Sequence, residues 1–129
     1  MSRAPVALYI AILSLIAVIG GCGLSGPAHA PTDTDAAADV NIRFHSFSPL
    51  LITIHKGEMV EWKNTAIISH TVTDIPAGDR GSLPKGAKPF DSGKIAAGGV
   101  YTHTFTVPGT YRYFCRIHKG MSGTVVVLP

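Results

Sequence analysis

The chain has little of what builds a helical or a multidomain protein. Its 129 residues allow one domain and not comfortably two. Beyond an apolar run near the N-terminus, no stretch shows helical periodicity of useful length, and there is no internal repeat. Charged residues make up only 15% of the chain, whereas its 14 Gly and 9 Pro are typical of short strands joined by many turns.

Cysteine is equally scarce, since the chain contains only Cys22 and Cys115. A disulfide between these two residues is one alternative for an exported protein. The residues around Cys115 favour a different role, in which its thiol stays free. The role of Cys22 depends on where the N-terminal segment is cleaved.

The N-terminal segment is typical of an export signal. Arg3 precedes the apolar run Val6–Ile19, which is too short and too weakly flanked for a stable transmembrane helix. The four residues Ile19–Cys22 resemble a bacterial lipoprotein box, in which the cysteine becomes the lipidated first residue. We therefore predict a signal peptide over residues 1–21 and lipidation at Cys22.

Residues 22–39 are rich in Gly, Pro, Ala, Thr and Asp, and they lack apolar periodicity. This composition predicts a lipid-anchored flexible tether. The alternative is cleavage after Ala30, at the small-residue motif Ala28–Ala30. That cleavage would leave a soluble periplasmic protein in place of one anchored to a membrane.

Short runs with strand character recur from Val40 onward and are separated by turns. We expect strands near residues 40–44, 51–55, 59–63, 70–73, 100–105, 110–114 and 123–128. Seven to eight strands of this length predict an all-β Greek-key β-sandwich over residues 40–129. Trp62 and the apolar members of each strand would fill the space between the two sheets.

One short segment carries a set of metal-binding side chains. Cys115, His118 and Met121 are spaced three residues apart, directly after the strand-like run 110–114 and just before another strand. A thiolate, an imidazole and a thioether select copper over magnesium, calcium or manganese. A mononuclear site of this kind needs a second imidazole, because two His and one Cys form its trigonal plane. His70, at a predicted strand end, is the candidate.

Further matches extend over Val40–Leu128, and with them the chain resembles the cupredoxins, the small blue copper proteins of the plastocyanin and amicyanin type. These matches are residues 47–49, 60–64, 90–93, 105–115 and 121–127. The resemblance implies one copper ion held strongly by His70, Cys115 and His118 and weakly by Met121. It also implies that the ring edge of His118 is the electron exit, within an apolar surface patch near Phe47, Pro49 and Ile117.

The segment between the strands departs from many relatives at two positions. Arg116 replaces a small hydroxyl residue that bonds to the asparagine matching Asn64, and Ile117 replaces a frequent proline. The sequence therefore does not predict that bond from Asn64. By strand alternation, Phe114 should face away from the core and lie at the surface.

The function that this resemblance implies is transfer of single electrons between redox partner proteins outside the cytoplasm. An exported module for copper buffering or delivery is the alternative, because it would use the same ligands.

The remaining histidines of the predicted domain, His45, His55 and His103, form no His-x-His pair. Enzymes of the multicopper oxidase or nitrite reductase type need extra imidazoles, so we expect no enzymatic activity. A Cys115–His118 nucleophile and base would leave Met121 unexplained.

The charge distribution suggests the kind of partner. From Val40 onward the chain has ten Lys and Arg against five Asp and Glu, and Arg116 and Lys119 flank His118. We expect these charges to steer a redox partner with an acidic docking rim. Nothing combines aromatic and basic residues in the stripe typical of nucleic-acid binding. The expected protein is an exported monomer, held by lipid on the periplasmic or outer side of a membrane.

Overall fold

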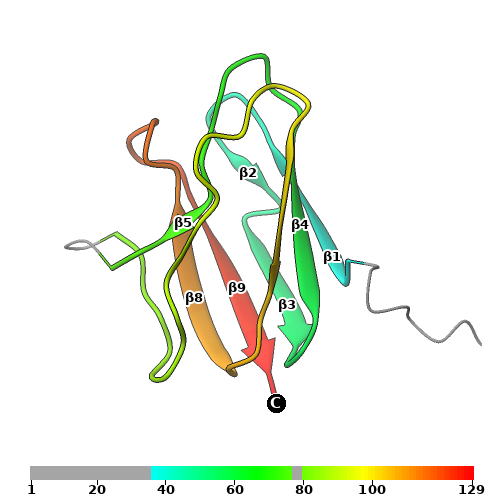
Figure 1. The fold of residues 1–129 in the computed structure, drawn as a ribbon, viewed down its shortest axis with the longest axis vertical. Helices are drawn as coiled ribbons and strands as arrows, with labels where there is room; N and C mark the ends of the chain where they lie inside the picture. The colour runs from blue at the N-terminus through cyan, green and yellow to red at the C-terminus, as the bar shows by residue number, and fades with distance from the viewer. Residues whose placement is uncertain (1–35, 77–79) are drawn as a thin grey trace, which may run out of the picture. The chain divides into compact units, whose positions relative to one another are not determined.

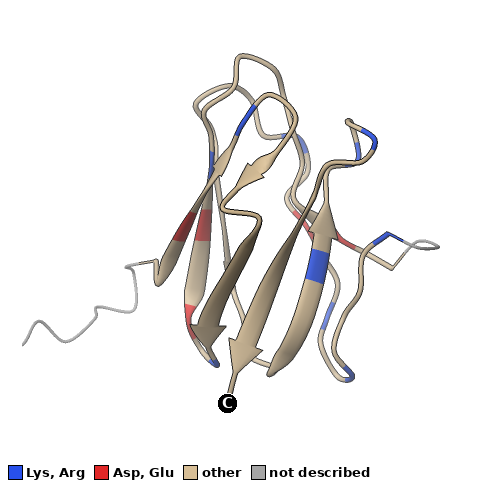
Figure 2. Cartoon of the chain, turned by 180° about the vertical axis from the view of Figure 1, so that it is seen from behind, with Lys and Arg blue, Asp and Glu red and all other residues tan. Residues whose placement is uncertain are grey.

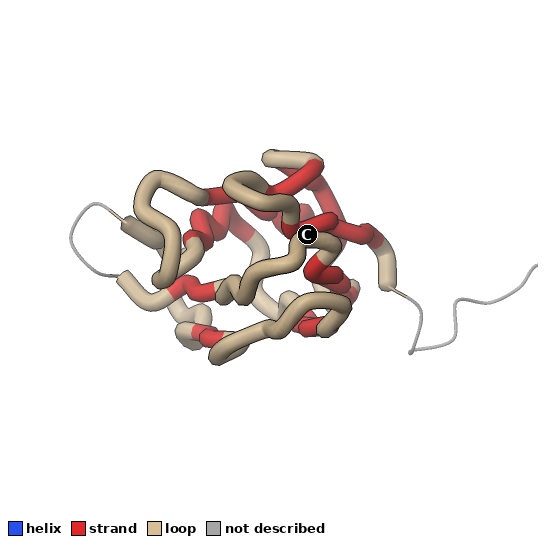
Figure 3. Tube along the Cα trace, turned by 90° about the horizontal axis from the view of Figure 1, so that it is seen from above, coloured by secondary structure: helices blue, strands red, loops and turns tan. Residues whose placement is uncertain are grey.

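The computed structural model describes residues 36–76 and 80–129. The described residues form nine strands and no helix (Figures 1 and 3). The strands are β1 (Ala38–Ile42), β2 (Phe47–Ser48), β3 (Leu51–His55), β4 (Met59–Asn64), β5 (Thr73–Asp74), β6 (Phe90–Asp91), β7 (Val100–Thr104), β8 (Gly109–Phe114) and β9 (Ser122–Leu128). Over the described ranges, no helix has the length and apolarity to cross a membrane. The predicted signal peptide, most of the tether and Cys22 lie outside the described residues.

The strands form two sheets, with the orders β2-β1-β4-β7 and β3-β9-β8-β5-β6. Two of the pairings are parallel, β1 with β4 and β3 with β9, and the others are antiparallel. Successive strands such as β3 and β4 lie in different sheets, so the connections cross between layers. The all-β sandwich predicted from the sequence is confirmed. Three of its strands, β2, β5 and β6, have only two residues each.

Alternation of apolar and polar residues positions the strands against the core. In β3, Ile52 and Ile54 are buried while their neighbours are exposed, and in β9 the buried residues include Val125 and Val127. The parallel register sets Ile52 beside Val125 and Ile54 beside Val127, so both apolar rows face the same side of the sheet. A shift of one residue would turn either row to solvent, which fixes the register.

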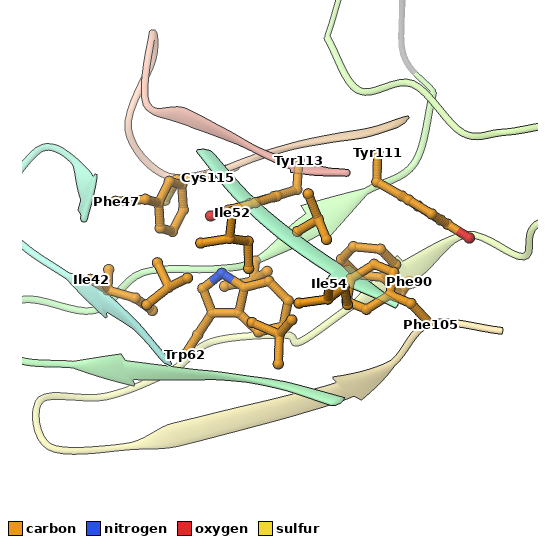
Figure 4. Packing of buried hydrophobic residues seen from close by; sticks show 14 of the residues in the cluster. Ile42, Phe47, Ile52, Ile54, Trp62, Phe90, Phe105, Tyr111, Tyr113 and Cys115 are labelled. Carbon is orange, nitrogen blue, oxygen red and sulfur yellow. The ribbon is translucent and has the colours of Figure 1, made fainter. Parts of the chain in front are cut away.

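Aromatic rings fill the space between the two sheets (Figure 4). Trp62 is fully buried, and its ring lies edge-on to Tyr113 with centroids 5.4 Å apart. The ring centroid of Phe105 lies 6.3 Å from that of Trp62 and 4.8 Å from that of Tyr111. Each large apolar side chain buried in this way stabilises the fold by about 1.5–3 kcal/mol relative to exposure. Trp62 therefore fills the core as predicted.

One predicted strand begins later than expected. His70 makes only an isolated bridge, in which its backbone exchanges two hydrogen bonds with Ile95, and β5 starts at Thr73. Residues 65–72 therefore form a connection whose course is set by hydrogen bonds to neighbouring loops. This connection lies at the same end of the sandwich as the β1–β2 and β8–β9 loops (Figure 1).

Candidate metal centre

Residues 115–121, which we call the ligand loop, are held between two paired strands. Phe114 at the end of β8 lies opposite Ser122 at the start of β9. The amide of Cys115 donates to the carbonyl oxygen of Met121 at 2.9 Å, and the amide of Met121 donates to His118 at 3.4 Å. Gly120 has a φ of +82°, a backbone conformation in which other residues are strained. These contacts fix the backbone of the loop and so the positions from which its side chains project.

Three donor atoms meet at this loop. The Sγ of Cys115 lies 3.8 Å from the Nδ1 of His70 and 3.6 Å from the Nδ1 of His118. Nitrogen and sulfur ligands bind zinc at about 2.0 and about 2.3 Å. With ligands of similar length at trigonal angles, sulfur and nitrogen would be separated by about 3.7 Å. The observed separations therefore suit one metal ion bound by all three atoms.

The donors differ in their access to solvent. His70 and Cys115 are buried, whereas His118 is half-buried. Met121 is 3% exposed and belongs to the same buried cluster as Cys115. His118 is thus the one member of this group of four that reaches the surface, as the resemblance implied.

The environment of His70 favours its neutral, metal-binding form. Burial lowers the pKa of His70, and the nearby rings of His118 and His45 lower it further. Metal binding requires an unprotonated imidazole nitrogen, so a lowered pKa keeps the ligand available. Its Nδ1 faces Cys115, while its buried Nε2 has no hydrogen-bond partner among the described residues.

Backbone and hydroxyl groups of Thr71 connect the two halves of the site. The amide of Thr71 donates to the Sγ of Cys115 at 3.4 Å. Its hydroxyl oxygen accepts a hydrogen bond of 2.8 Å from the amide of Arg116. Hydrogen bonds to the cysteine sulfur are one of the features that tune the potential of a copper site. The sequence did not indicate this role, because a threonine after a histidine has no distinctive pattern.

Asn64 supports the other side of the site. Its side-chain amide donates to the carbonyl oxygens of Ile68, at 2.8 Å, and Ile95, at 3.0 Å. Its carbonyl oxygen accepts from the amide of Ala66 at 3.0 Å. Asn64 is therefore committed to the connection that carries His70, and Thr71 takes the contact to Arg116.

The surface around His118 differs in part from the sequence-based expectation. Phe47, expected to lie near the surface patch, is 1% exposed and packs edge-on to Tyr113, so it adds no exposed surface to that patch. Ile117 is exposed, and Phe44 is 53% exposed in the β1–β2 loop. His45, to which the sequence assigned no role, lies edge-to-face against His118 with ring centroids 5.4 Å apart.

Phe114 also differs from expectation. It lies outside the core cluster, as strand alternation predicts, yet it is only 6% exposed. The guanidinium of Arg80 covers its ring at 5.0 Å from the centroid, and Gly81 lies close to the ring edge. The prediction of a surface phenylalanine is therefore wrong, because the segment before β6 folds over it.

Comparisons with known proteins agree with this geometry. A family model described as copper binding proteins, plastocyanin/azurin family, matches residues 34–128. Plastocyanin from Prochlorothrix hollandica is 30% identical over 126 residues, which cover 90% of this chain and 89% of that protein. Amicyanin-alpha from Methylorubrum extorquens is 29% identical over 118 residues, covering 92% of each.

Two solved structures illustrate the range of similar folds. A variant of amicyanin in its reduced state has a TM-score of 0.60 and 28% identity, covering 74% of this chain and 84% of that one. A copper-containing nitrite reductase from Thermus scotoductus has a TM-score of 0.61 and 30% identity. The match covers 71% of this chain but only 22% of the reductase.

Proposed function

Because the chain belongs to the plastocyanin/azurin family of copper-binding proteins, we propose that it is a mononuclear blue copper protein that carries single electrons. His70, Cys115 and His118 would bind the ion, with Met121 as the weak axial ligand. The observation that carries this proposal is the spacing of the three donor atoms, with sulfur 3.8 and 3.6 Å from the two nitrogens. A thiolate with two imidazoles and a weak methionine is the donor set of blue copper sites.

The surroundings of the site suit electron transfer. Both ends of the ligand loop are held by the β8–β9 pairing, and the connection carrying His70 is held by Asn64. Donor atoms held in this way would move little when the metal gains or loses an electron. Electron transfer would therefore require little structural rearrangement. The half-buried ring of His118 is the one proposed ligand that reaches the surface, where a partner would dock.

The spectrum of the loaded protein tests this function. With one equivalent of Cu(II), the thiolate–copper bond should give an intense blue colour through sulfur-to-copper charge transfer. Cys115→Ser should abolish the colour even where some copper remains on the two imidazoles. Reversible one-electron reduction with the metal retained should follow. A colourless wild-type protein after loading would overturn the proposal.

The same site gives no support to an enzymatic role. Within residues 36–76 and 80–129, one group of three His, Cys, Asp or Glu donors could hold a metal, and it is His70, Cys115 and His118. The similar nitrite reductase is much longer, since the match covers 22% of it. We therefore assign electron transfer without catalysis, which an assay for nitrite reduction by the copper-loaded protein would test.

Basic residues beside the ligand loop indicate the partner. A hollow of about 610 Å³, which we call the basic hollow, has no acidic residue among the described residues that line it. Its charged lining residues are Arg80, Arg112, Arg116 and Lys119. Blue segments on β8 and the ligand loop are visible on this side of the sandwich in Figure 2. We assign this side to a redox partner with an acidic rim, because complementary charges raise the association rate.

Charge reversal tests this assignment. Arg116 is better left in place, because its guanidinium pairs with Asp91 at 2.6 Å. Arg112→Glu with Lys119→Glu should slow electron exchange with an acidic partner at low salt and leave the blue spectrum unchanged. Lys56→Glu with Lys85→Glu is the matched control, since it makes the same charge change away from the ligand loop. Equal rates for the two double variants would exclude the basic hollow as the docking side.

We further assign the protein to the periplasmic or outer side of a membrane, as a monomer anchored by lipid at Cys22. The sequence of Ile19–Cys22 supports this assignment, and the fold does not bear on it. Mass spectrometry of the native protein should find a lipidated N-terminal Cys22, and Cys22→Ala should release the protein from membranes or block its maturation. An unlipidated protein that begins at Pro31 would show cleavage after Ala30.

A further inference from the structure

His45 lies at the tip of the β1–β2 turn, above the metal centre. The amide of Arg43 donates to the carbonyl oxygen of Ser46 at 2.8 Å, which closes the turn. Ile42 and Phe47 on either side are paired and buried, so the turn is anchored in the core. His45 itself is exposed. A rigid turn thus presents one imidazole to solvent at the end of the sandwich that carries the ligand loop.

Three histidine rings lead from solvent to the buried donors. The ring of His45 contacts that of His118, with centroids 5.4 Å apart and planes at 81°. The ring of His118 in turn lies 4.6 Å from that of His70. Exposure falls along this row, since His45 is exposed, His118 is half-buried and His70 is fully buried. The ring of Phe44 packs edge-on against that of His45, with centroids 4.4 Å apart.

The row has a consequence for an ion that enters the site from solvent. Cys115, Met121 and His70 are buried, so His118 is the first of the four proposed ligands that the ion can reach. The free charges nearby do not attract a cation, because Arg43 lies in the β1–β2 turn and Lys119 in the ligand loop, while Arg116 is paired with Asp91. An imidazole nitrogen is a good copper ligand and would compensate for this unfavourable approach. His45 is that imidazole, placed directly outside His118.

We propose that His45 is a copper-acceptance residue, which with His118 forms an outer two-imidazole site that holds the ion briefly during loading and release. The proposal rests on the proposed copper site. During loading, His45 and His118 would hold the ion first, and Cys115 would then replace His45 as a ligand. The Cys115 thiol would give its proton to a solvent base, with no change in the oxidation state of the ion.

A kinetic role of this kind has a distinct signature. A residue that assists only the passage of the ion should change loading and release by the same factor and leave the equilibrium unchanged. A residue that merely positions His118 should alter the final spectrum or the copper affinity. Measuring both rates together with the affinity therefore separates these two roles.

The experiment uses three variants of the full chain without metal. His45→Phe keeps an aromatic ring against His118 but removes the nitrogen ligands, and His45→Ala removes both. His55→Ala is the matched control, because His55 is also an exposed histidine but lies at the end of β3. Each protein is mixed with one equivalent of Cu(II) chloride, and the growth of the charge-transfer band is followed by stopped-flow. Release is followed by loss of that band in excess chelator.

We expect His45→Phe and His45→Ala to load and release copper several-fold more slowly than wild type, with the same final spectrum and affinity. His55→Ala should behave as wild type. Wild-type rates in His45→Phe would overturn the proposal. Slower loading accompanied by faster release and weaker affinity would also overturn it, since His45 would then be a positioning residue. Failure of the proposed function would appear differently, as a wild-type protein without the band.

Discussion

The hydroxyl of Thr71 accepts a hydrogen bond from the amide of Arg116, so the residue after one proposed ligand is fastened to the residue after another. Thr71 follows His70, and Arg116 follows Cys115. The amide of Thr71 also donates to the sulfur of Cys115. Two bonds from one residue therefore join the connection between the sheets to the ligand loop.

Thr71→Val should weaken this junction. The substitution keeps the shape of the side chain and the hydrogen bond from the Thr71 amide to Cys115. It removes the oxygen that accepts from the Arg116 amide and, at 3.1 Å, from the Thr73 hydroxyl. Because the bond from the Arg116 amide is only partly buried, its loss should cost about 0.5–1.5 kcal/mol. Chemical unfolding of the metal-free protein should show a loss of this size, and Thr71→Ser should retain most of the stability. Equal stability of the valine and serine variants would show that the bond to Arg116 contributes nothing.

Met121→Gln should keep copper bound and lower its reduction potential. Met121 is buried beside Cys115, and an amide oxygen in its place is a harder donor that stabilises Cu(II) over Cu(I). Voltammetry of the loaded protein measures the change. Met59→Gln is the control, because Met59 begins β4 at the end away from Asn64 and the ligand loop. A potential equal to that of wild type would mean that Met121 does not bind the metal.

Asp74 should make the fold less stable as the pH rises. Burial raises the pKa of Asp74 from 3.8 to about 7, against a smaller opposing effect of the Ser82 amide. Between these values the unfolded chain has lost the proton while the folded chain keeps it. The folded state binds more protons in this window, so its stability falls with rising pH until about pH 7 and is then constant.

Asp74→Asn removes this dependence. Each pKa unit corresponds to about 1.4 kcal/mol, so the variant should gain up to about 4 kcal/mol over wild type at pH 8 and little at pH 4. Denaturant unfolding at a series of pH values measures the difference directly. Parallel curves for the two proteins between pH 4 and pH 8 would contradict the buried position of this carboxyl group.

Gly123→Ala should destabilise the sandwich. A Cβ at Gly123 would overlap the Cζ and hydroxyl of Tyr113, whose ring lies directly over the glycine. Tyr113 is fully buried against Trp62 and cannot move without repacking the core. Overpacking of this kind costs about 1–3 kcal/mol.

Thermal unfolding should show a lower melting temperature for Gly123→Ala. Thr124→Ala, in the same strand but only partly buried, is the control for strand propensity. If the two alanine variants melt at the same temperature, the close approach of Tyr113 to Gly123 does not constrain the fold.

The local pattern of the chain determined the fold class and pointed to the proposed donor set. Alternation in segments such as Leu51–His55 and Ser122–Leu128 identified the strands, because each turns one face to the core. The spacing of Cys115, His118 and Met121 identified the ligand loop. Three possible metal ligands within seven residues can be recognised without knowing which distant parts of the chain meet in the fold. His70 was proposed because a mononuclear copper site of this kind needs a second imidazole, and its ring nitrogen lies near the sulfur of Cys115.

Only the tertiary structure decided what surrounds these donors. The contacts of Thr71 with Cys115, of Arg80 with Phe114 and of His45 with His118 join residues far apart in the chain. Such pairs leave no periodic signal in a sequence, since each depends on how two loops meet after the sheets have packed. The burial of Phe47 could not be predicted for the same reason: an aromatic residue at a strand end can face the core or solvent, and here packing against Tyr113 turned it inward.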